Sequence, residues 1–200
     1  PHFLFNTLQS ISNVAGIERA SVTGDMVVRL ANFFRYTLDH DDSVVTLARE
    51  VDLLRDYISL QELRFGERIS FEMDCDARCG SCMIPKFTLQ PLVENAIFHG
   101  IEPKGSAGEV TLRVERDTAN GDVLIHLTDD GVGMTPEQAA RALQEPGPEE
   151  AAAKYRHVGM WNVHKRLQYS FGEAYGLSIE SEPDIGTTVT IRLPGPDSKQ

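Results

Sequence analysis

Leu89-Gln-Pro-Leu-Val-Glu-Asn-Ala-Ile-Phe-His-Gly100 is the stretch around which this chain is organised. Apolar residues recur in it at the spacing of a helix, namely Leu89, Leu92, Val93 and Ala96. This pattern predicts a helix that packs into a core. Three polar residues fall on its other side, namely Glu94, Asn95 and His99. Because a carboxamide on a packed helix costs free energy unless it has a polar partner, the stretch also predicts a binding site.

Two stretches farther along the chain suit a nucleotide: Asp129-Asp-Gly-Val-Gly-Met134 and His157-Val-Gly-Met-Trp-Asn162. A carboxylate at a strand end, such as Asp129, can accept a hydrogen bond from an exocyclic amine, which favours adenine over guanine. Gly131 and Gly133 allow the backbone to approach a ring or a phosphate closely. Gly159 opens a predicted helix whose first amides can hold phosphate. The side-chain carbonyl of Asn95 is a hard oxygen ligand of the kind that Mg²⁺ takes.

Each of these features also has an ordinary structural explanation: a strand that leads into a turn, a hydrogen bond at a helix end, and a helix start of no special role. Their occurrence in one chain, in the order helix, strand, loop and helix, favours an adenine-nucleotide site.

The first third of the chain has the periodicity of helices, over about residues 4–15, 21–38 and 48–65. The first helix has an apolar stripe made of Leu4, Leu8, Ile11 and Ala15. At about 100° per residue, His2 points away from this stripe, on the side of Asn6, Gln9 and Asn13. Helices this short cannot close a large core, so we expect a second copy of the chain to cover their stripes in a dimeric bundle.

In the remainder of the chain, apolar residues alternate with other residues, a pattern that is typical of β-strands. It occurs over about residues 69–73, 110–114, 123–127, 177–179 and 189–193. Asn120-Gly121 predicts a hairpin between two of these strands. Thr135 and Gln138 predict a capping box at the start of a helix over 136–143, and another helix is expected over 158–169. We therefore expect an α+β fold in which helices cover a mixed sheet and the glycines gather at one end.

Composition excludes several classes of function. A net charge of −11 disfavours nucleic acid, which is bound through Lys and Arg, and leaves no basic patch for a membrane. No apolar run approaches the roughly 18 residues of a membrane-spanning helix. Cys75, Cys79 and Cys82 lack a fourth ligand for zinc and are expected to be reduced thiols. The chain begins inside an apparent motif at Pro1-His2, which we interpret as the start of a C-terminal piece of a longer protein.

With these motifs in view, the chain resembles the GHKL ATP-binding fold and, within it, sensor histidine kinases of the LytS type. Leu89–Gly100 looks like the N box of these kinases, Asp129–Met134 like the first glycine box, and Gly159–Asn162 like part of the second. Gly186-Thr187-Thr188 resembles their late glycine-threonine turn. Pro1-His2-Phe-Leu-Phe-Asn6 is similar to their phosphoacceptor motif, and the likeness includes Phe34-Arg-Tyr36 and Arg64-Phe65.

The resemblance implies three parts: a helical dimerisation and phosphotransfer segment over 1–66, a GHKL (Bergerat) ATP-binding domain over 67–195 and a tail over 196–200. It implies ATP and Mg²⁺ as ligands and His2 as the residue that is phosphorylated. Asn95 is implied as the Mg²⁺ ligand. Asn6 follows His2 by one helical turn on the same face, and the hypothesis is that it orients water for dephosphorylation of the partner. The implied nucleotide-binding residues are Glu94, Asn95, His99, Asp129, Gly131, Gly133, Met134, Gly159, Met160, Asn162, Thr187 and Thr188.

The implied partners are a second copy of the chain and the receiver domain of a response regulator, whose aspartate takes the phosphoryl group from His2. The implied location is the cytoplasmic portion of a bacterial sensor that a missing N-terminal region anchors in the membrane. A lid over the nucleotide is expected between Met134 and Gly159.

This sequence departs from the pattern of the kinases at several positions. His157 stands where the second glycine box usually opens with glycine, and Phe98 stands where many relatives carry Lys or Arg. Lys154, Arg156 or Lys165 could supply the missing phosphate contact, or could be solvated charges. His99 is either a phosphate contact or a packed or capping residue. Phe3 follows His2 where many other histidine kinases have an acid, so no base for His2 is identified.

Two other functions stay open at this point. The departures at His157 and Phe98 allow a nucleotide-binding signalling module that dimerises but has no kinase activity. A free-running ATPase is disfavoured by Pro91, because hydrolytic relatives place a water-activating Glu four residues before the metal-binding Asn, and proline cannot act as a base.

Overall fold

The computed structural model describes residues 2–38, 43–147 and 158–196. Lys154, Arg156 and His157, together with much of the expected lid, lie outside these ranges. None of the helices within them combines the length and the apolar character that a membrane crossing requires.

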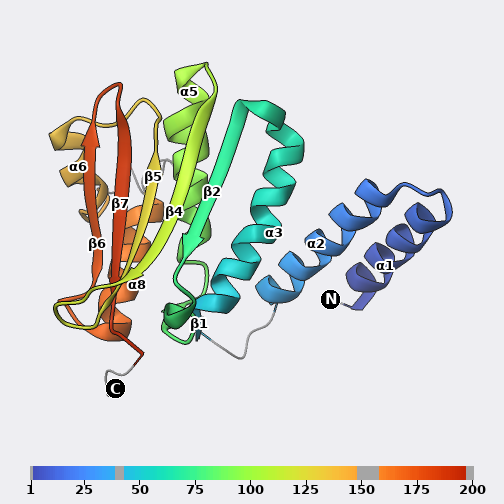
Figure 1. Cartoon of the computed structure of the whole chain (residues 1–200), viewed down its shortest axis with the longest axis horizontal. Helices are drawn as coiled ribbons and strands as arrows, with labels where there is room; N and C mark the ends of the chain where they lie inside the picture. The colour runs from blue at the N-terminus through green and yellow to red at the C-terminus, as the bar shows by residue number, and fades with distance from the viewer. Residues whose placement is uncertain (1, 39–42, 148–157, 197–200) are drawn as a thin grey trace.

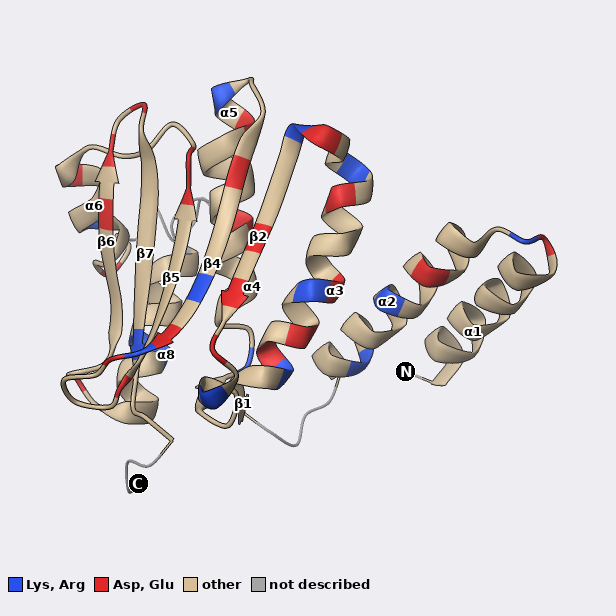
Figure 2. Ribbon diagram, in the orientation of Figure 1, with Lys and Arg blue, Asp and Glu red and all other residues tan. Residues whose placement is uncertain are grey.

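An antiparallel pair of helices, α1 (His2–Ile17) and α2 (Ser21–Leu38), stands at one side of the molecule (Figure 1). α1 packs on α2 through Leu8 and Ala15, which are buried, while His2 and Asn6 are exposed as the helical phase predicts. Ile11 was expected in the buried stripe and is instead 45% exposed, because α2 covers only the neighbouring face of α1. α1 contains no Lys, Arg, Asp or Glu (Figure 2).

Five strands form one mixed sheet in the order β2-β4-β5-β7-β6. Their bounds are Ile69–Cys75 for β2, Gly108–Arg116 for β4, Val123–Asp129 for β5, Gly176–Glu182 for β6 and Gly186–Leu193 for β7. β2 runs parallel to β4, and the other neighbours are antiparallel. The register aligns one row of apolar residues across the sheet, made of Met73, Leu112, Leu127, Val189 and Ile179. Alternation in the sequence therefore turns one whole face of the sheet toward the core.

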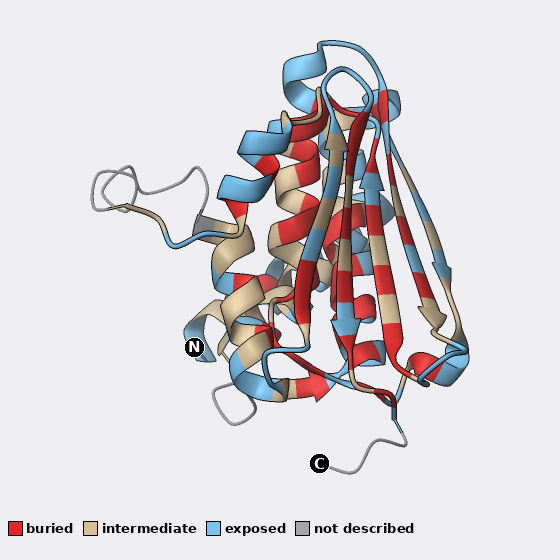
Figure 3. Ribbon diagram, turned by 90° about the vertical axis from the view of Figure 1, so that its left-hand side faces the viewer, coloured by how far each residue is buried: buried red, intermediate tan, exposed pale blue. Residues whose placement is uncertain are grey.

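Helices cover that face (Figure 3). They are α3 (Leu47–Phe65), α4 (Leu89–Asn95), α6 (Pro136–Ala142) and α8 (Val158–Phe171). α4 continues into η3, a π-helix over Ala96–Ile101, and then into the short α5 (Glu102–Lys104). Buried residues of α3, such as Leu54 and Ile58, belong to the same core as the sheet. The division after residue 66 stays a prediction, because the packing of α3 is continuous with the sandwich.

Several local predictions are confirmed. Gln138 donates its backbone N–H to the Thr135 hydroxyl at 3.3 Å, and its side-chain oxygen accepts the Thr135 N–H at 2.8 Å, which completes the capping box. β4 and β5 pair as a hairpin whose loop contains Gly121 at φ +79°. The α+β class and the covering of a mixed sheet by helices are also confirmed.

Four short elements were not predicted. β1 (Val44–Thr46) and β3 (Met83–Pro85) form a separate two-stranded sheet, and η1 (Gly66–Arg68) and η2 (Ala77–Cys79) are single turns. The three cysteines are free thiols. In the described part of the chain, no group of three or more His, Cys, Asp or Glu side chains is placed to hold a metal ion.

Candidate functional site

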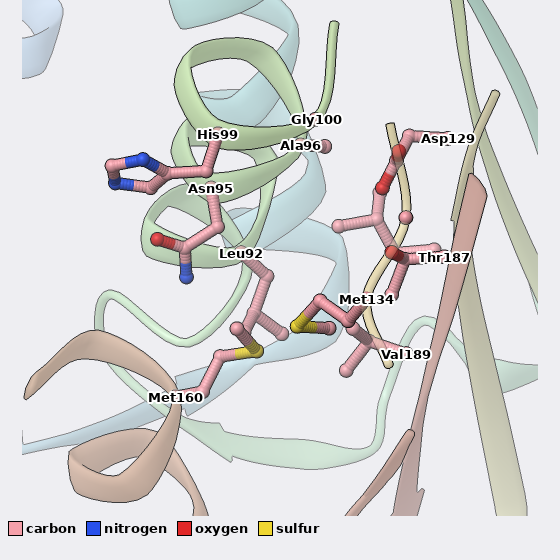
Figure 4. Close-up of a pocket in the computed structure, with 12 residues that line it drawn as sticks. Leu92, Asn95, Ala96, His99, Gly100, Asp129, Met134, Met160, Thr187 and Val189 are labelled. Atoms are coloured by element: carbon pink, nitrogen blue, oxygen red, sulfur yellow. The ribbon is translucent and has the colours of Figure 1, made fainter. Parts of the chain in front are cut away.

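A pocket opens between the α4–η3 helix and the sheet, as Figure 4 shows. Its wall contains most of the residues that the sequence singles out: Asn95, His99, Asp129, Gly133, Met134, Met160 and Thr187. The remaining lining residues are small or apolar: Leu92, Ala96, Gly100, Leu127 and Val189. A flat aromatic ring bound here would meet hydrophobic side chains on two sides and a few polar groups between them.

Asp129 is the polar group on the sheet side of the pocket. It ends β5, is buried, and accepts a hydrogen bond from the Gly131 N–H at 2.9 Å. Burial raises its pKa to about 6, although the Gly131 N–H acts in the opposite direction. The carboxyl group is therefore ionised at neutral pH, and the Gly131 bond leaves it further acceptor sites for a ligand N–H.

Glycines hold this carboxylate against the helix. A Cβ on Gly131 would overlap the backbone of Gly100, and a Cβ on Gly100 would come within 2.6 Å of Asp129 Oδ1. The Val132 N–H donates to the Gly100 carbonyl at 2.9 Å. The π-helical segment and the glycine turn thus meet backbone to backbone. Gly131 serves this internal contact and does not line the pocket.

Ser181 ties the glycine turn to the start of β7. It accepts the Met134 N–H at 2.8 Å, donates to the Gly186 carbonyl at 2.8 Å and lies 2.9 Å from the Thr187 hydroxyl. Sequence analysis did not single out Ser181. The alternation of Leu177 and Ile179 places residue 181 on the same inward face, and this was the signal that could have found it.

Asn95 stands where α4 meets the first turn of α8. A Cβ on Gly159 would lie 3.4 Å from the Asn95 side-chain nitrogen, so the glycine permits this approach. Within the described ranges the Asn95 side chain makes no hydrogen bond, so its carbonyl oxygen is available. Magnesium in nucleotide sites takes few protein ligands and keeps waters and phosphates, and a single carboxamide beside the first turn of a helix fits that requirement.

The structure does not bring every predicted residue into this pocket. Glu94 accepts a hydrogen bond from Gln90 Nε2 at 2.9 Å on another face of α4. Thr188 lies on the outer face of the sheet, where its hydroxyl is 3.0 Å from that of Thr128. Gly159 and Asn162 line an adjacent groove together with Phe87, Pro91, Trp161, Val163, Lys165, Arg166 and Tyr169.

The turn that leads into α4 is held by a buried acid that sequence analysis missed. Glu50 of α3 is 1% exposed and accepts the backbone N–H groups of Phe87 at 2.9 Å and Thr88 at 3.3 Å. Arg166 of α8 donates to the Phe87 carbonyl at 2.6 Å. Burial raises the pKa of Glu50 to about 7. Glu50 lies between Leu47 and Val51, which belong to the buried apolar stripe of α3. This position in the sequence could have indicated that Glu50 is buried.

Tyr36 connects this turn to the helical hairpin. Its ring packs edge-on against Phe87, with ring centres 5.1 Å apart, and Lys86 and Arg49 lie over its face. Its buried hydroxyl makes no hydrogen bond of standard geometry. Burial is the main cause that raises the pKa of this hydroxyl, and the nearby Glu50 carboxylate raises it further. The end of α2 is thereby packed on the segment that sets the start of α4.

His2 and Asn6 lie one helical turn apart on the exposed side of α1. In Figure 1, α2 and α3 stand between α1 and the sheet that carries the pocket. The histidine therefore reaches a ligand in a pocket only if the hairpin moves or if the pocket belongs to a second copy.

Comparison with known families decides what these parts are. The family described as histidine kinase matches residues 1–69, and the family described as histidine kinase-, DNA gyrase B- and HSP90-like ATPase matches residues 85–197. The chain belongs to the histidine kinase family. It holds the two parts of a sensor histidine kinase core, and its ATPase-like part contains the pocket.

Relatives of this kinase family align along nearly all of the chain. Sensor histidine kinase YesM of Bacillus subtilis is 38% identical and is matched over 97% of this chain and 31% of its own length. Sensor protein LytS of Bacillus subtilis is 31% identical, over 100% of this chain and 33% of its own length. The chain thus spans about a third of the length of these relatives.

Solved histidine kinases share the fold at low identity. The histidine kinase domain of the blue-light activated enzyme EL346 from Erythrobacter litoralis matches with a TM-score of 0.52 at 16% identity, over 97% of this chain and 96% of that one. Full-length ShkA in complex with AMPPNP has a TM-score of 0.55 at 19% identity, over 90% of this chain and 38% of that one. ThkA in complex with the response regulator protein TrrA has a TM-score of 0.53 at 17% identity, over 89% of this chain and 51% of that one.

Proposed function

We propose that this kinase core uses ATP and Mg²⁺ to phosphorylate His2 and passes the phosphoryl group to an aspartate of a response regulator. The observation that carries the proposal is the pocket in which the Asp129 carboxylate and the Asn95 carboxamide face one cavity, in a chain whose His2 is exposed on a separate helix.

Each part of the pocket has one role in this proposal. The Asp129 carboxylate accepts a hydrogen bond from the adenine amine, and Leu92, Met134 and Met160 pack on the ring. Asn95 provides its oxygen to Mg²⁺, and the first amides of α8 hold phosphate. The complex of ShkA, a protein of the same fold, with AMPPNP supports a nucleotide as the ligand.

His2 is proposed to receive the terminal phosphoryl group that bound ATP supplies. A neutral imidazole has a nitrogen lone pair that can attack in line, and the protein contributes mainly by positioning this ring. Pro91 stands four residues before Asn95 and lines the groove beside Gly159, so no carboxylate at that position activates water. This favours transfer to a protein group over hydrolysis.

The partners are proposed on similar grounds. The ThkA–TrrA complex supports a response regulator as the acceptor, and Asn6, one turn after His2, is proposed to orient water during dephosphorylation of that partner. The apolar residues exposed on α1 and α2 support a homodimer through the hairpin. By resemblance to sensor kinases, we propose that the parent protein is anchored in a membrane by a region outside this sequence and holds this part in the cytoplasm.

Incubation with γ-labelled ATP tests the proposal. We expect acid-labile, alkali-stable label on the wild-type chain, no label on His2→Gln, and full label on the matched control His126→Gln, whose ring lies on the outer face of the sheet beside Thr190. Nucleotide binding without label on any residue would support a signalling module without kinase activity. Release of phosphate without protein label would support an ATPase.

A further inference from the structure

The described lining of the nucleotide pocket contains no Lys or Arg. It does contain the Asp129 carboxylate, in a chain whose net charge is −11. A nucleotide triphosphate adds several negative charges, which a single Mg²⁺ cancels only in part. A cation close to Asn95 would therefore strengthen binding of the phosphates without affecting the adenine ring.

Arg64 lies beside the helix that carries Asn95. It belongs to the last turn of α3, and its guanidinium carbon is 5.5 Å from the ring centre of Phe98 and 4.9 Å from that of Phe65. Phe98 follows Asn95 by three residues and precedes His99, which lines the pocket. The two rings, with their centres 6.2 Å apart, form a platform that holds the guanidinium against the π-helical segment that follows Asn95.

The donors of Arg64 are uncommitted. Its side chain is exposed, and within the described ranges it makes neither a hydrogen bond nor an ion pair. Other cations near the pocket and the adjacent groove are engaged: Lys104 with Asp130 at 2.8 Å, Lys165 with Gln168 at 3.1 Å and Arg166 with the Phe87 carbonyl at 2.6 Å. Contact with aromatic faces leaves the N–H edge of a guanidinium free for a planar, bidentate bond to phosphate.

We propose that Arg64 binds the terminal phosphates of the nucleotide whose adenine lies at Asp129. α3 would then contribute to the nucleotide site although it precedes the ATPase-like match, which begins at residue 85. The inference rests on the proposed function, because it requires an adenine nucleotide in the pocket. It adds a phosphate-binding residue that contacts the ligand from a different helix.

Binding of three probes separates a phosphate contact from a structural role. Adenosine, Mg–ADP and Mg–AMPPNP are titrated into wild type, Arg64→Ala and Arg64→Lys by calorimetry, with Arg68→Ala as the control. Arg68 is also exposed and lies four residues after Arg64. Its substitution by Ala removes the same charge. We expect Arg64→Ala to weaken Mg–AMPPNP by about tenfold or more, Mg–ADP by less, and adenosine not at all. Arg64→Lys keeps part of the affinity, and Arg68→Ala keeps all of it.

Two results would overturn the inference while leaving the nucleotide site intact. Equal loss for all three probes would show that Arg64 supports the fold of the site, and no loss in Arg64→Ala would assign the phosphate contact to another cation, such as Lys154 or Arg156. A wild-type chain that binds none of the three probes would instead remove the proposed function, and this inference with it.

Discussion

Asp129 shows how one side chain can link nucleotide affinity to pH. Its burial raises the pKa of the free carboxyl to about 6, and only the ionised form accepts a hydrogen bond from adenine at both oxygens. We predict that the affinity for adenosine falls as the pH is lowered from 7 through 6 to 5. Calorimetry with adenosine measures this without interference from a phosphate group, which titrates near pH 6.

Asp129→Asn is the control for this pH dependence. We expect it to bind adenosine about tenfold more weakly at pH 7, because a charge-assisted hydrogen bond is lost, and to show a nearly flat profile between pH 5 and 7. A profile as steep as that of wild type would mean that another group causes the pH dependence and that Asp129 does not contact the ring.

Gly131 is required by packing and not by ligand contact. A Cβ at this position would overlap the Gly100 carbonyl carbon, so the backbone of one segment would have to shift. We predict that Gly131→Ala lowers the free energy of unfolding by about 3 kcal/mol or more, measured by urea titration. Gly16 lies in α1, and a Cβ added there would have no atom within 4 Å. We expect Gly16→Ala to raise the free energy of unfolding by up to about 1 kcal/mol, because alanine favours the helix. Similar midpoints for the two variants would refute the close contact.

At the scale of elements, Glu50 joins α3 to the start of α4 and lies beside Tyr36 at the end of α2. The pKa of Glu50 is about 7 in the folded chain and about 4.5 when unfolded, because burial disfavours the charged form. The folded chain therefore binds more protons between these values. The contribution of Glu50 to stability is present in full below pH 4.5 and is lost as the pH rises to 7.

We predict that Glu50→Gln makes the free energy of unfolding less dependent on pH between about 4.5 and 7, as measured by urea titration at several pH values. Glu50→Ala should cost a few kcal/mol, because it leaves the N–H groups of Phe87 and Thr88 buried without an acceptor. Glu62→Gln changes an exposed acid on the same helix and serves as control. If Glu62→Gln altered the pH dependence as much as Glu50→Gln, general charge effects would explain the result.

Elements in which apolar residues recur at the spacing of a helix or a strand could be predicted from the sequence. Elements that are defined by partners distant in the sequence could not. The alternation of Val123, Ile125 and Leu127 fixes a strand, and the helical phase of α1 fixes the exposure of His2. β1 and β3 have three residues each, which is too short for a period, and the π-helical segment has no period that distinguishes it from α-helix.

The same distinction holds for the site. Asn95, Asp129 and Thr187 were found because each belongs to a motif with its own local geometry. Glu94 was placed with Asn95 although one residue turns a helix by about 100°, and Thr188 was placed with Thr187 although alternation puts it on the opposite face of β7. Ser181 and Glu50 act through partners that sequence order does not reveal, namely the Met134 and Phe87 amides.

At the scale of the whole molecule, the apolar surface of the hairpin is the feature that one chain leaves unexplained. Phe3 is 85% exposed, Ile11 45%, Val14 50% and Ile17 82% on α1, while Val22, Met26 and Val28 are exposed on α2. α1 contains no Lys, Arg, Asp or Glu, and one chain alone leaves these apolar side chains in contact with water. A second hairpin would remove that surface from water and form a four-helix bundle.

We predict that Ile11→Asp combined with Val14→Asp converts a dimer to a monomer in sedimentation velocity, because each carboxylate would be buried without a partner in the bundle. Ile185→Asp is the matched control: Ile185 is 66% exposed at the β6–β7 turn, far along the chain from the hairpin, and the variant should stay dimeric. At about 100° per residue, His2 and Asn6 face away from Ile11, so an interface centred on Ile11 leaves the phosphoacceptor side open. A wild-type chain that sediments as a monomer at high concentration, or a double variant that stays dimeric, would place the interface elsewhere.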